Sequence, residues 1–255
     1  MATEKNAPTK SVATFLQDND GALPAHLQQD AGMGNENVGT DDLAIPRLDL
    51  IQQLSPQIDK SSPKFIEGAE TGHIFNSLTG EVYDFAFVIN LQFEQKWQIF
   101  KKRKFGGGFE GSFDNEADAQ KHLDAQGLPA EQYDVVDTAI HKCLKLDDDG
   151  NPEAPVLIYM SGSKQRVSKG WNSAIQLKNP DAARFASVWT LQSSPEKNKQ
   201  GQPYHNFKVD FAGWAGEDLY AEAKRLYEGL VEGGTDALAG DKGDSHKESV
   251  STADA

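Results

Sequence analysis

Residues 82–93 read VYDFAFVINLQF, and this stretch is the strongest β-strand signal in the chain. It is rich in β-branched and aromatic residues, which pack well on a pleated surface. The pattern predicts a next strand from Gln95 to Lys104. The glycines at 106–108 follow directly and predict a turn, because glycine readily adopts the backbone conformations that turns require. A β-sheet is therefore expected at the centre of the fold.

The segments on either side of residues 82–108 predict more strands and a few helices. Pro46 prevents a continuous helix at the start, so 48–54 is expected to be a short strand or a short helix. Together these patterns predict an α+β fold: a β-rich antiparallel sheet or an open (OB-like) barrel with a few helices. Further strands are expected at 133–146, 155–161, 187–192 and 205–214, and helices at 113–127, 163–178 and 217–230.

Composition divides the chain into three parts. Only 38% of the 255 residues are hydrophobic, and the formal net charge is −14. Residues 1–40 are rich in small and polar residues and predict a flexible N-terminal arm, and residues 231–255 predict a disordered acidic C-terminal tail. Residues 41–230 are expected to form a single domain.

The chain also carries signals about its location. It has no apolar run near the roughly 18 residues that cross a membrane, and its first residues lack a hydrophobic signal segment. Cys143 is the single cysteine, so no intramolecular disulfide can form. These features predict a cytoplasmic protein with no membrane partner.

The stretch KWQIFKKRKFGGGFEGSF at 96–113 is the strongest indication of function. Five of the nine residues 96–104 are Lys or Arg, none is acidic, and aromatic residues are interleaved with them. Cations follow a phosphate backbone and aromatic rings stack on bases, which is the chemistry of single-strand binding. The alternative is a β-hairpin with one solvated basic face and one buried aromatic face.

Two further basic segments, 164–178 and 197–208, also contain aromatic residues. Three such segments in an acidic chain suggest one common groove that binds single-stranded DNA. Sequence-specific reading of a duplex is less expected, since neither zinc-finger spacing nor a clear helix-turn-helix is present. The predicted nucleic-acid-binding residues are Lys96, Trp97, Lys101, Lys102, Arg103, Lys104, Phe105, Phe109, Lys164, Arg166, Lys169, Trp171, Lys197 and Lys199.

Signals for catalysis or a bound cofactor are weak. Ser161 and Lys164 match a Ser-x-x-Lys pattern, which arises often by chance. His141 and Cys143 share a strand face but have no further cysteine nearby to complete a metal site. Residues 147–150 read DDDG and lack the ligand spacing of a calcium loop, so a turn is expected. No enzymatic activity, catalytic residue, metal or cofactor is predicted.

Four stretches resemble a family of small acidic phage proteins: GTDDLAIPRLDLIQQLSPQ at 39–57, FIEGAETGHIFNSLTGEVYD at 65–84, KFGGGFEG at 104–111, and PEKNKQGQPYHNFKVDFAGW at 195–214. This family is associated with phage single-stranded-DNA-binding proteins, including a type that acts as a cofactor of the phage RNA polymerase. The resemblance covers about residues 38–215. It implies a phage protein in the cytoplasm of a bacterial host that binds single-stranded DNA in replication, recombination or transcription.

Two other functions stay open at this point. The chain could be a protein-interaction adaptor or RNA-polymerase cofactor whose basic strands dock an acidic partner, or a nuclease with scattered carboxylates. The acidic tail could compete with nucleic acid for the basic groove, or recruit a phage polymerase or other replication and transcription proteins.

Overall fold

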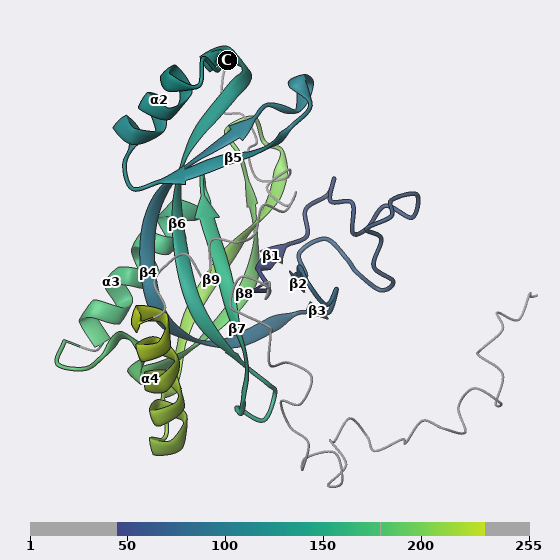
Figure 1. The fold of residues 1–255 in the computed structure, drawn as a ribbon. Coiled ribbons are helices and arrows are strands. Elements are labelled where there is room, and N and C mark those ends of the chain that lie inside the picture. Colours follow the sequence, from purple (N-terminus) through teal and green to yellow (C-terminus); the bar gives the residue numbers. More distant parts are fainter. Residues whose placement is uncertain (1–44, 179, 233–255) are drawn as a thin grey trace, which may run out of the picture. The chain divides into compact units, whose positions relative to one another are not determined.

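An antiparallel sheet of six strands forms the centre of the part of the chain that the computed structural model describes, residues 45–178 and 180–232 (Figure 1). These residues belong to one unit that begins at Ala44. The strand order is β7-β6-β4-β8-β9, and β5 also pairs with β4. The α+β, β-rich prediction is confirmed. The strands are β4 (Phe85–Lys101), β5 (Gly108–Phe113), β6 (Tyr133–Leu146), β7 (Pro152–Ser161), β8 (Ser187–Lys197) and β9 (Pro203–Trp214).

Strand β4 differs from the prediction of two separate strands. It runs unbroken for 17 residues and ends at Lys101. The 3₁₀ helix η3 (Arg103–Phe105) follows it. Strand β6 pairs with β4 almost throughout, from Phe87 opposite Leu146 to Lys101 opposite Tyr133. This long partner holds Glu94 and Gln95 within the ladder, so no turn forms there. A bulge between Asn90 and Gln92 interrupts the register, and bulges bend a strand.

A second, three-stranded sheet contains β1 (Leu48–Leu50), β2 (Ile74–Asn76) and β3 (Val82–Tyr83). The segment that contains β1 contacts both edge strands of the large sheet. The backbone N–H of Leu157 in β7 donates to the carbonyl of Pro46, and the side-chain amide of Gln52 exchanges two 2.9 Å hydrogen bonds with the backbone of His205 in β9. Within the described residues β7 and β9 do not pair with each other, so the sheet is not a closed barrel.

The three predicted helices are present, and each packs on a different part of the large sheet. They are α2 (Glu116–Ala125), α3 (Lys164–Lys178) and α4 (Glu217–Glu232). Helix α2 packs on β5, α3 packs on β7 and β9, and α4 packs on β4 and on η5 (Arg184–Ala186). The Asn115 side chain caps α2 by accepting from the N–H of Asp118. A further 3₁₀ turn, η4 (Ala130–Gln132), precedes β6.

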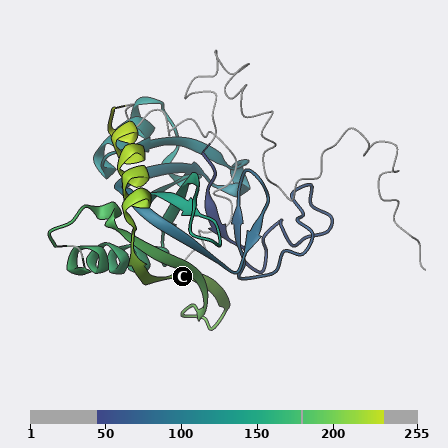
Figure 2. The same cartoon turned by 90° about the horizontal axis from the view of Figure 1, so that it is seen from below.

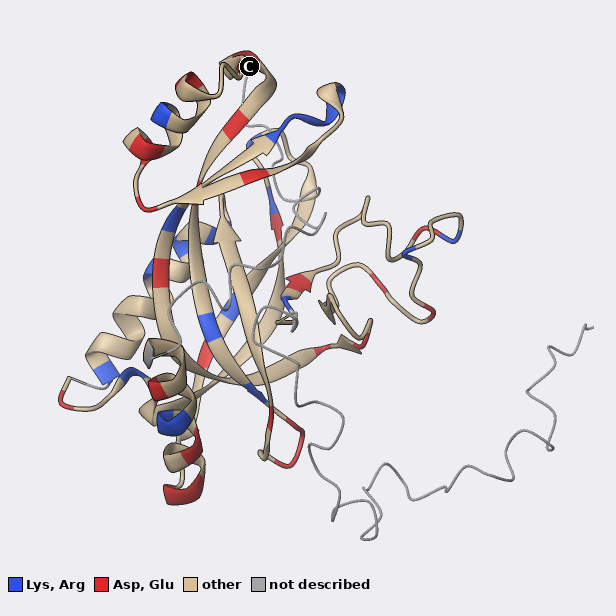
Figure 3. Ribbon diagram, in the orientation of Figure 1, with Lys and Arg blue, Asp and Glu red and all other residues tan. Residues whose placement is uncertain are grey.

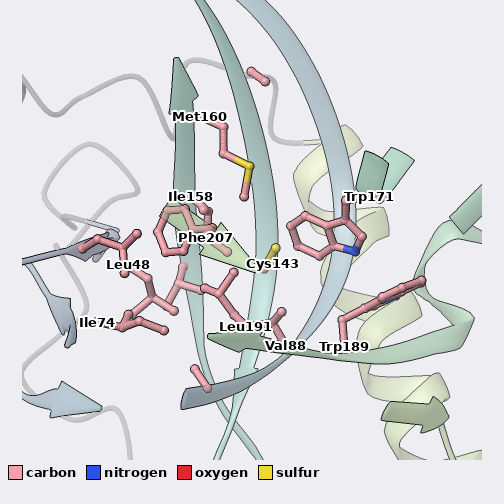
Figure 4. Close-up of a cluster of buried hydrophobic side chains, with 14 of the residues drawn as sticks. Leu48, Ile74, Val88, Cys143, Ile158, Met160, Trp171, Trp189, Leu191 and Phe207 are labelled. Carbon is pink, nitrogen blue, oxygen red and sulfur yellow. The ribbon is translucent and has the colours of Figure 1, made fainter. Parts of the chain in front are cut away.

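The main hydrophobic core joins the two sheets to α3 (Figure 4). Leu48 and Ile74 come from the small sheet, Trp189 and Phe207 come from β8 and β9, and Trp171 comes from α3. The last nine residues of β6 are all buried, so this strand is covered on both faces. The core therefore fixes α3 against the β8–β9 hairpin.

The terminal predictions fall mostly outside the described residues. The predicted arm, residues 1–40, is not described, and of the predicted tail only 231–232 are, as the end of α4. No helix among the described residues has the length and apolar character needed to cross a membrane.

Candidate nucleic-acid interface

The connection between β4 and β5 carries four successive Lys and Arg residues, 101–104 (Figure 3). Arg103, Lys104 and Phe105 of η3 are all exposed there. The next three glycines have φ values of 110°, 70° and 130°, which residues with a side chain rarely adopt. The N–H of Gly106 donates to the carbonyl of Arg103 at 3.0 Å, so the turn has internal hydrogen bonds. The predicted glycine turn is confirmed, and we call residues 101–108 the basic tip.

Most cations of the basic tip have no acidic partner. Lys102 lies 3.5 Å from the carboxylate of Asp134, but Lys101, Arg103 and Lys104 form no ion pair with any residue of 45–178 or 180–232. The ammonium group of Lys104 lies 4.9 Å from the ring centre of Phe105, whose exposed fraction is 37%. The tip therefore exposes Arg103, Lys104 and the Phe105 ring to solvent, and Lys101 is half-buried beside them.

Three other predicted residues of this hairpin support the tip rather than extend its charged surface. Lys96 is paired with Asp114 at 2.5 Å. Trp97 packs against a small core that β4 and β6 share with α2. Phe109 lies against Phe100, with ring centres 5.5 Å apart. These contacts hold β5 and α2 against the end of β4.

Two predicted residues of the second basic segment lie in the interior. Lys164 is only 6% exposed, and its ammonium group donates to Asp49 at 2.7 Å. Trp171 is 2% exposed and stacks on His141, with ring centres 4.5 Å apart. In this structure neither side chain is open to a phosphate or to a stacking base.

A buried polar chain lies beside Trp171 and was not predicted from the sequence. The side-chain oxygen of Asn90 accepts from Arg184 at 2.8 Å, so the amide nitrogen of Asn90 faces Nδ1 of His141, also at 2.8 Å. Nδ1 therefore accepts, and Nε2 carries the proton toward Ser168 at 2.8 Å. The residues are far apart in sequence, and no motif joins them.

The residue types of this chain are those of a Ser-His-Asn triad, but its proton arrangement is the reverse. A histidine whose Nε2 already carries a proton cannot remove one from the Ser168 hydroxyl. Burial, together with the charge of Arg184, lowers the pKa of His141 to about 3, so the ring stays neutral. Burial also raises the pKa of Cys143. The polar chain therefore satisfies hydrogen bonds in the core beneath α3.

The exposed part of α3 forms a cleft with the β8–β9 hairpin. The cleft has a volume of about 450 Å³. Arg166 at its rim is 74% exposed and donates to Glu196 at 2.7 Å, and the Tyr204 hydroxyl donates to the same carboxylate. Lys208 also lines the cleft and is paired with Asp210 at 2.6 Å. The cleft is lined by Arg166, Val167, Gly170, Trp171, Ala174, Ser194, Glu196, Phe207, Lys208 and Val209.

The remaining predicted cations belong to the same two elements. Lys169 is exposed on α3, and Lys197 and Lys199 are exposed at the end of the β8–β9 hairpin. Two of the three basic segments therefore meet around one cleft.

The third basic segment lies elsewhere. Strand β8 pairs with the first residues of β4, from Phe85 to Ile89, and continues past Phe85 toward its own hairpin tip. The basic tip begins at Lys101, the last residue of β4. Figure 2 shows the β8–β9 hairpin apart from the β4–β5 connection. The structure therefore has two basic surfaces that are formed by different elements, the basic tip and the cleft.

The residues that suggested catalysis or metal binding have other partners. Lys164 pairs with Asp49, as described above. The carboxylate of Asp147 accepts from the backbone N–H groups of Asp149 at 3.0 Å and Asn151 at 2.7 Å, which confirms the predicted turn between β6 and β7. No group of three or more His, Cys, Asp or Glu side chains among the described residues is placed to hold a metal ion.

The model of a family described as Pam3 phage gp34-like protein matches residues 17–236, which is most of the chain. Neither the curated proteins nor the solved structures contain a match.

Proposed function

Because the chain belongs to the Pam3 phage gp34-like family and is a phage protein, we propose that it binds single-stranded DNA with little sequence preference. The binding serves replication, recombination or transcription of the phage genome. The protein needs no catalytic group for this role, and it acts in the cytoplasm of the bacterial host.

The basic tip is the observation that carries this proposal. Lys101, Arg103 and Lys104 have no carboxylate partner within the described residues, so binding phosphate breaks no ion pair there. A chain with a net charge of −14 repels DNA in general, and cations concentrated at a turn supply local attraction. The partly exposed ring of Phe105 can stack on a base, and such contacts contribute roughly 1–3 kcal/mol per base.

The structure favours a single strand over a duplex as the ligand of the basic tip. In a duplex the faces of the bases are stacked on each other, so the Phe105 ring has no base face to contact. In a single strand every base has an open face that any aromatic side chain can use. We therefore expect little sequence preference and a steep dependence of affinity on salt.

A second candidate function is a protein adaptor or RNA-polymerase cofactor. Leu177 of α3 and Trp214 of β9 are large apolar side chains that are exposed to solvent. Phe211 joins Trp214 to the last residue of α3, because its ring lies 5.4 Å from the Trp214 ring and 4.5 Å from the ammonium group of Lys178. An exposed Trp is typical of protein-binding surfaces. This function predicts weak DNA binding and a stable protein complex recovered from infected cells.

Fluorescence anisotropy with a labelled oligo-dT of about 30 nucleotides tests the proposal, since this length exceeds common single-strand site sizes. The triple variant Lys101→Ala, Arg103→Ala and Lys104→Ala should bind at least about tenfold more weakly than wild type. The control triple Lys60→Ala, Lys64→Ala and Lys224→Ala removes the same charge from exposed sites outside both basic surfaces. The proposal is contradicted if the two triple variants lose the same affinity for oligo-dT. It is also contradicted if the wild-type protein does not bind oligo-dT at low salt.

A further inference from the structure

The cleft between α3 and the β8–β9 hairpin has two chemically different parts. Its apolar wall is formed by the partly exposed side chains of Val167 and Ala174 from α3 and Val209 from β9, and the buried Trp171 and Phe207 lie behind them. Its polar lining residues are Arg166, Ser194, Glu196 and Lys208. An apolar wall with a few polar groups is typical of sites for small ligands, and about 450 Å³ is within their usual size range.

The charge around the cleft is opposite to the charge of the whole chain. Residues 164–178 and 194–210 together contain seven Lys and Arg residues and two acidic residues. One of the seven, Lys164, is buried with Asp49, and the others lie on exposed positions of the two elements. An anionic ligand is therefore attracted to this part of the surface.

Arg166 and Glu196 define where an anionic group would bind. Burial acts to raise the pKa of Glu196, but hydrogen bonds from Tyr204, Asn206 and Arg166 outweigh it, so the pKa lies below its ordinary value. The Glu196 carboxylate is therefore ionised, and it forms an ion pair with the guanidinium of Arg166. A phosphate group makes the same charge-assisted hydrogen bonds to arginine as a carboxylate does, and so it can take the place of Glu196.

Gly170 leaves part of the cleft open. It lies in the middle of α3, where glycine is unfavourable for helix stability, and it lines the cleft. A Cβ atom at this position would meet nothing within 4 Å. A larger side chain at 170 therefore extends into the cleft without entering the core.

We propose that this cleft binds one nucleotide of a DNA single strand, with the base against the apolar wall and the phosphate at Arg166 and Lys208. The inference rests on the proposed function but concerns a site separate from the basic tip. When the site is empty, Arg166 is paired with Glu196. The phosphate of the bound nucleotide takes the place of Glu196 and so releases Arg166 from this ion pair.

Three glycine variants test the cleft. Gly170→Leu fills it, whereas Gly170→Ala adds only a methyl group, and Gly229→Leu places the same side chain in α4, where the added Cβ is also free of contacts. Gly170→Leu should bind the oligo-dT about tenfold more weakly, and the two controls should bind within about twofold of wild type. NMR of ¹⁵N-labelled protein with millimolar thymidine 5′-monophosphate should shift α3 and β9 signals in wild type but not in Gly170→Leu.

The outcomes separate this inference from the proposed function. If Gly170→Leu binds the oligo-dT like wild type and the mononucleotide shifts no α3 or β9 signal, the cleft inference is wrong, and the basic tip is unaffected. If the basic-tip triple loses affinity while the mononucleotide still shifts the cleft signals, both statements are supported. If the cleft signals respond only to an added protein or peptide, the occupant is not a nucleotide and the inference fails.

Discussion

The Nδ1 atom of His141 accepts a hydrogen bond from the side-chain amide of Asn90 at 2.8 Å, in the core beneath α3. Because Asn90 also accepts from Arg184, its amide orientation is determined, and so is the tautomer of His141. Protonation of the ring would break this bond and place a second cation near Arg184.

Stability should therefore fall in mildly acidic solution. The pKa of His141 is about 3 in the folded chain and near 6.5 when unfolded, so between these values only the unfolded chain binds the proton. The free energy of unfolding should decrease by about 1.4 kcal/mol per pH unit below pH 6.5, or about 2 kcal/mol at pH 5. Urea unfolding at pH 7, 6 and 5 measures this decrease. His141→Gln, which does not titrate, should show a smaller decrease; an equal slope would contradict the assignment.

Lys164 should contribute to stability rather than to DNA binding. Its buried ammonium group pairs with Asp49, so Lys164→Ala removes this ion pair. We expect a loss of about 2–3 kcal/mol in the free energy of unfolding, below the usual cost of breaking a fully buried pair because Asp49 is partly exposed. The affinity of the folded protein for oligo-dT should change by less than about twofold. Denaturant unfolding and anisotropy below the unfolding transition measure the two effects.

Removing the charge of Glu196 should strengthen DNA binding. In Glu196→Gln the neutral amide holds Arg166 less tightly and no longer repels phosphate. The expected gain in affinity for oligo-dT is about threefold, in the range for a single exposed ion pair. Glu228→Gln in α4 makes the same change of net charge away from both basic surfaces and should have little effect. A gain of equal size in both variants would show a general charge effect instead.

The glycine turn of the basic tip should matter for binding more than for overall stability. Gly106 has φ 110°, so Gly106→Ala places a side chain in a strained backbone conformation. The cost to the local turn is about 1–2 kcal/mol. Because the tip is exposed and outside the main core, the midpoint of thermal unfolding should change little, whereas hydrogen exchange at 103–108 should become faster and oligo-dT affinity should fall. Gly150→Ala, in an exposed turn with φ 86°, is the matched control and should leave affinity unchanged.

Most secondary structure could be predicted because its signals are local. The strand expected at 133–146 is present as β6, and the helices expected at 113–127 and 217–230 are present as α2 and α4. The prediction of a break between 82–93 and the next strand was wrong. Whether β4 continues through Glu94 depends on its pairing with β6, about 40 residues further along the chain, and no local pattern contains that information.

Some features of the candidate site could likewise be predicted from local sequence, and others depend on distant contacts. The sequence by itself determined the basic tip, since clustered charges remain exposed at a turn and three successive glycines favour one. Only the tertiary structure decided that Lys164 and Trp171 are buried, that Arg166 faces Glu196, and that two of the three basic segments share a cleft. Burial and pairing depend on which distant elements pack against a residue, and that packing is settled by the whole hydrophobic core.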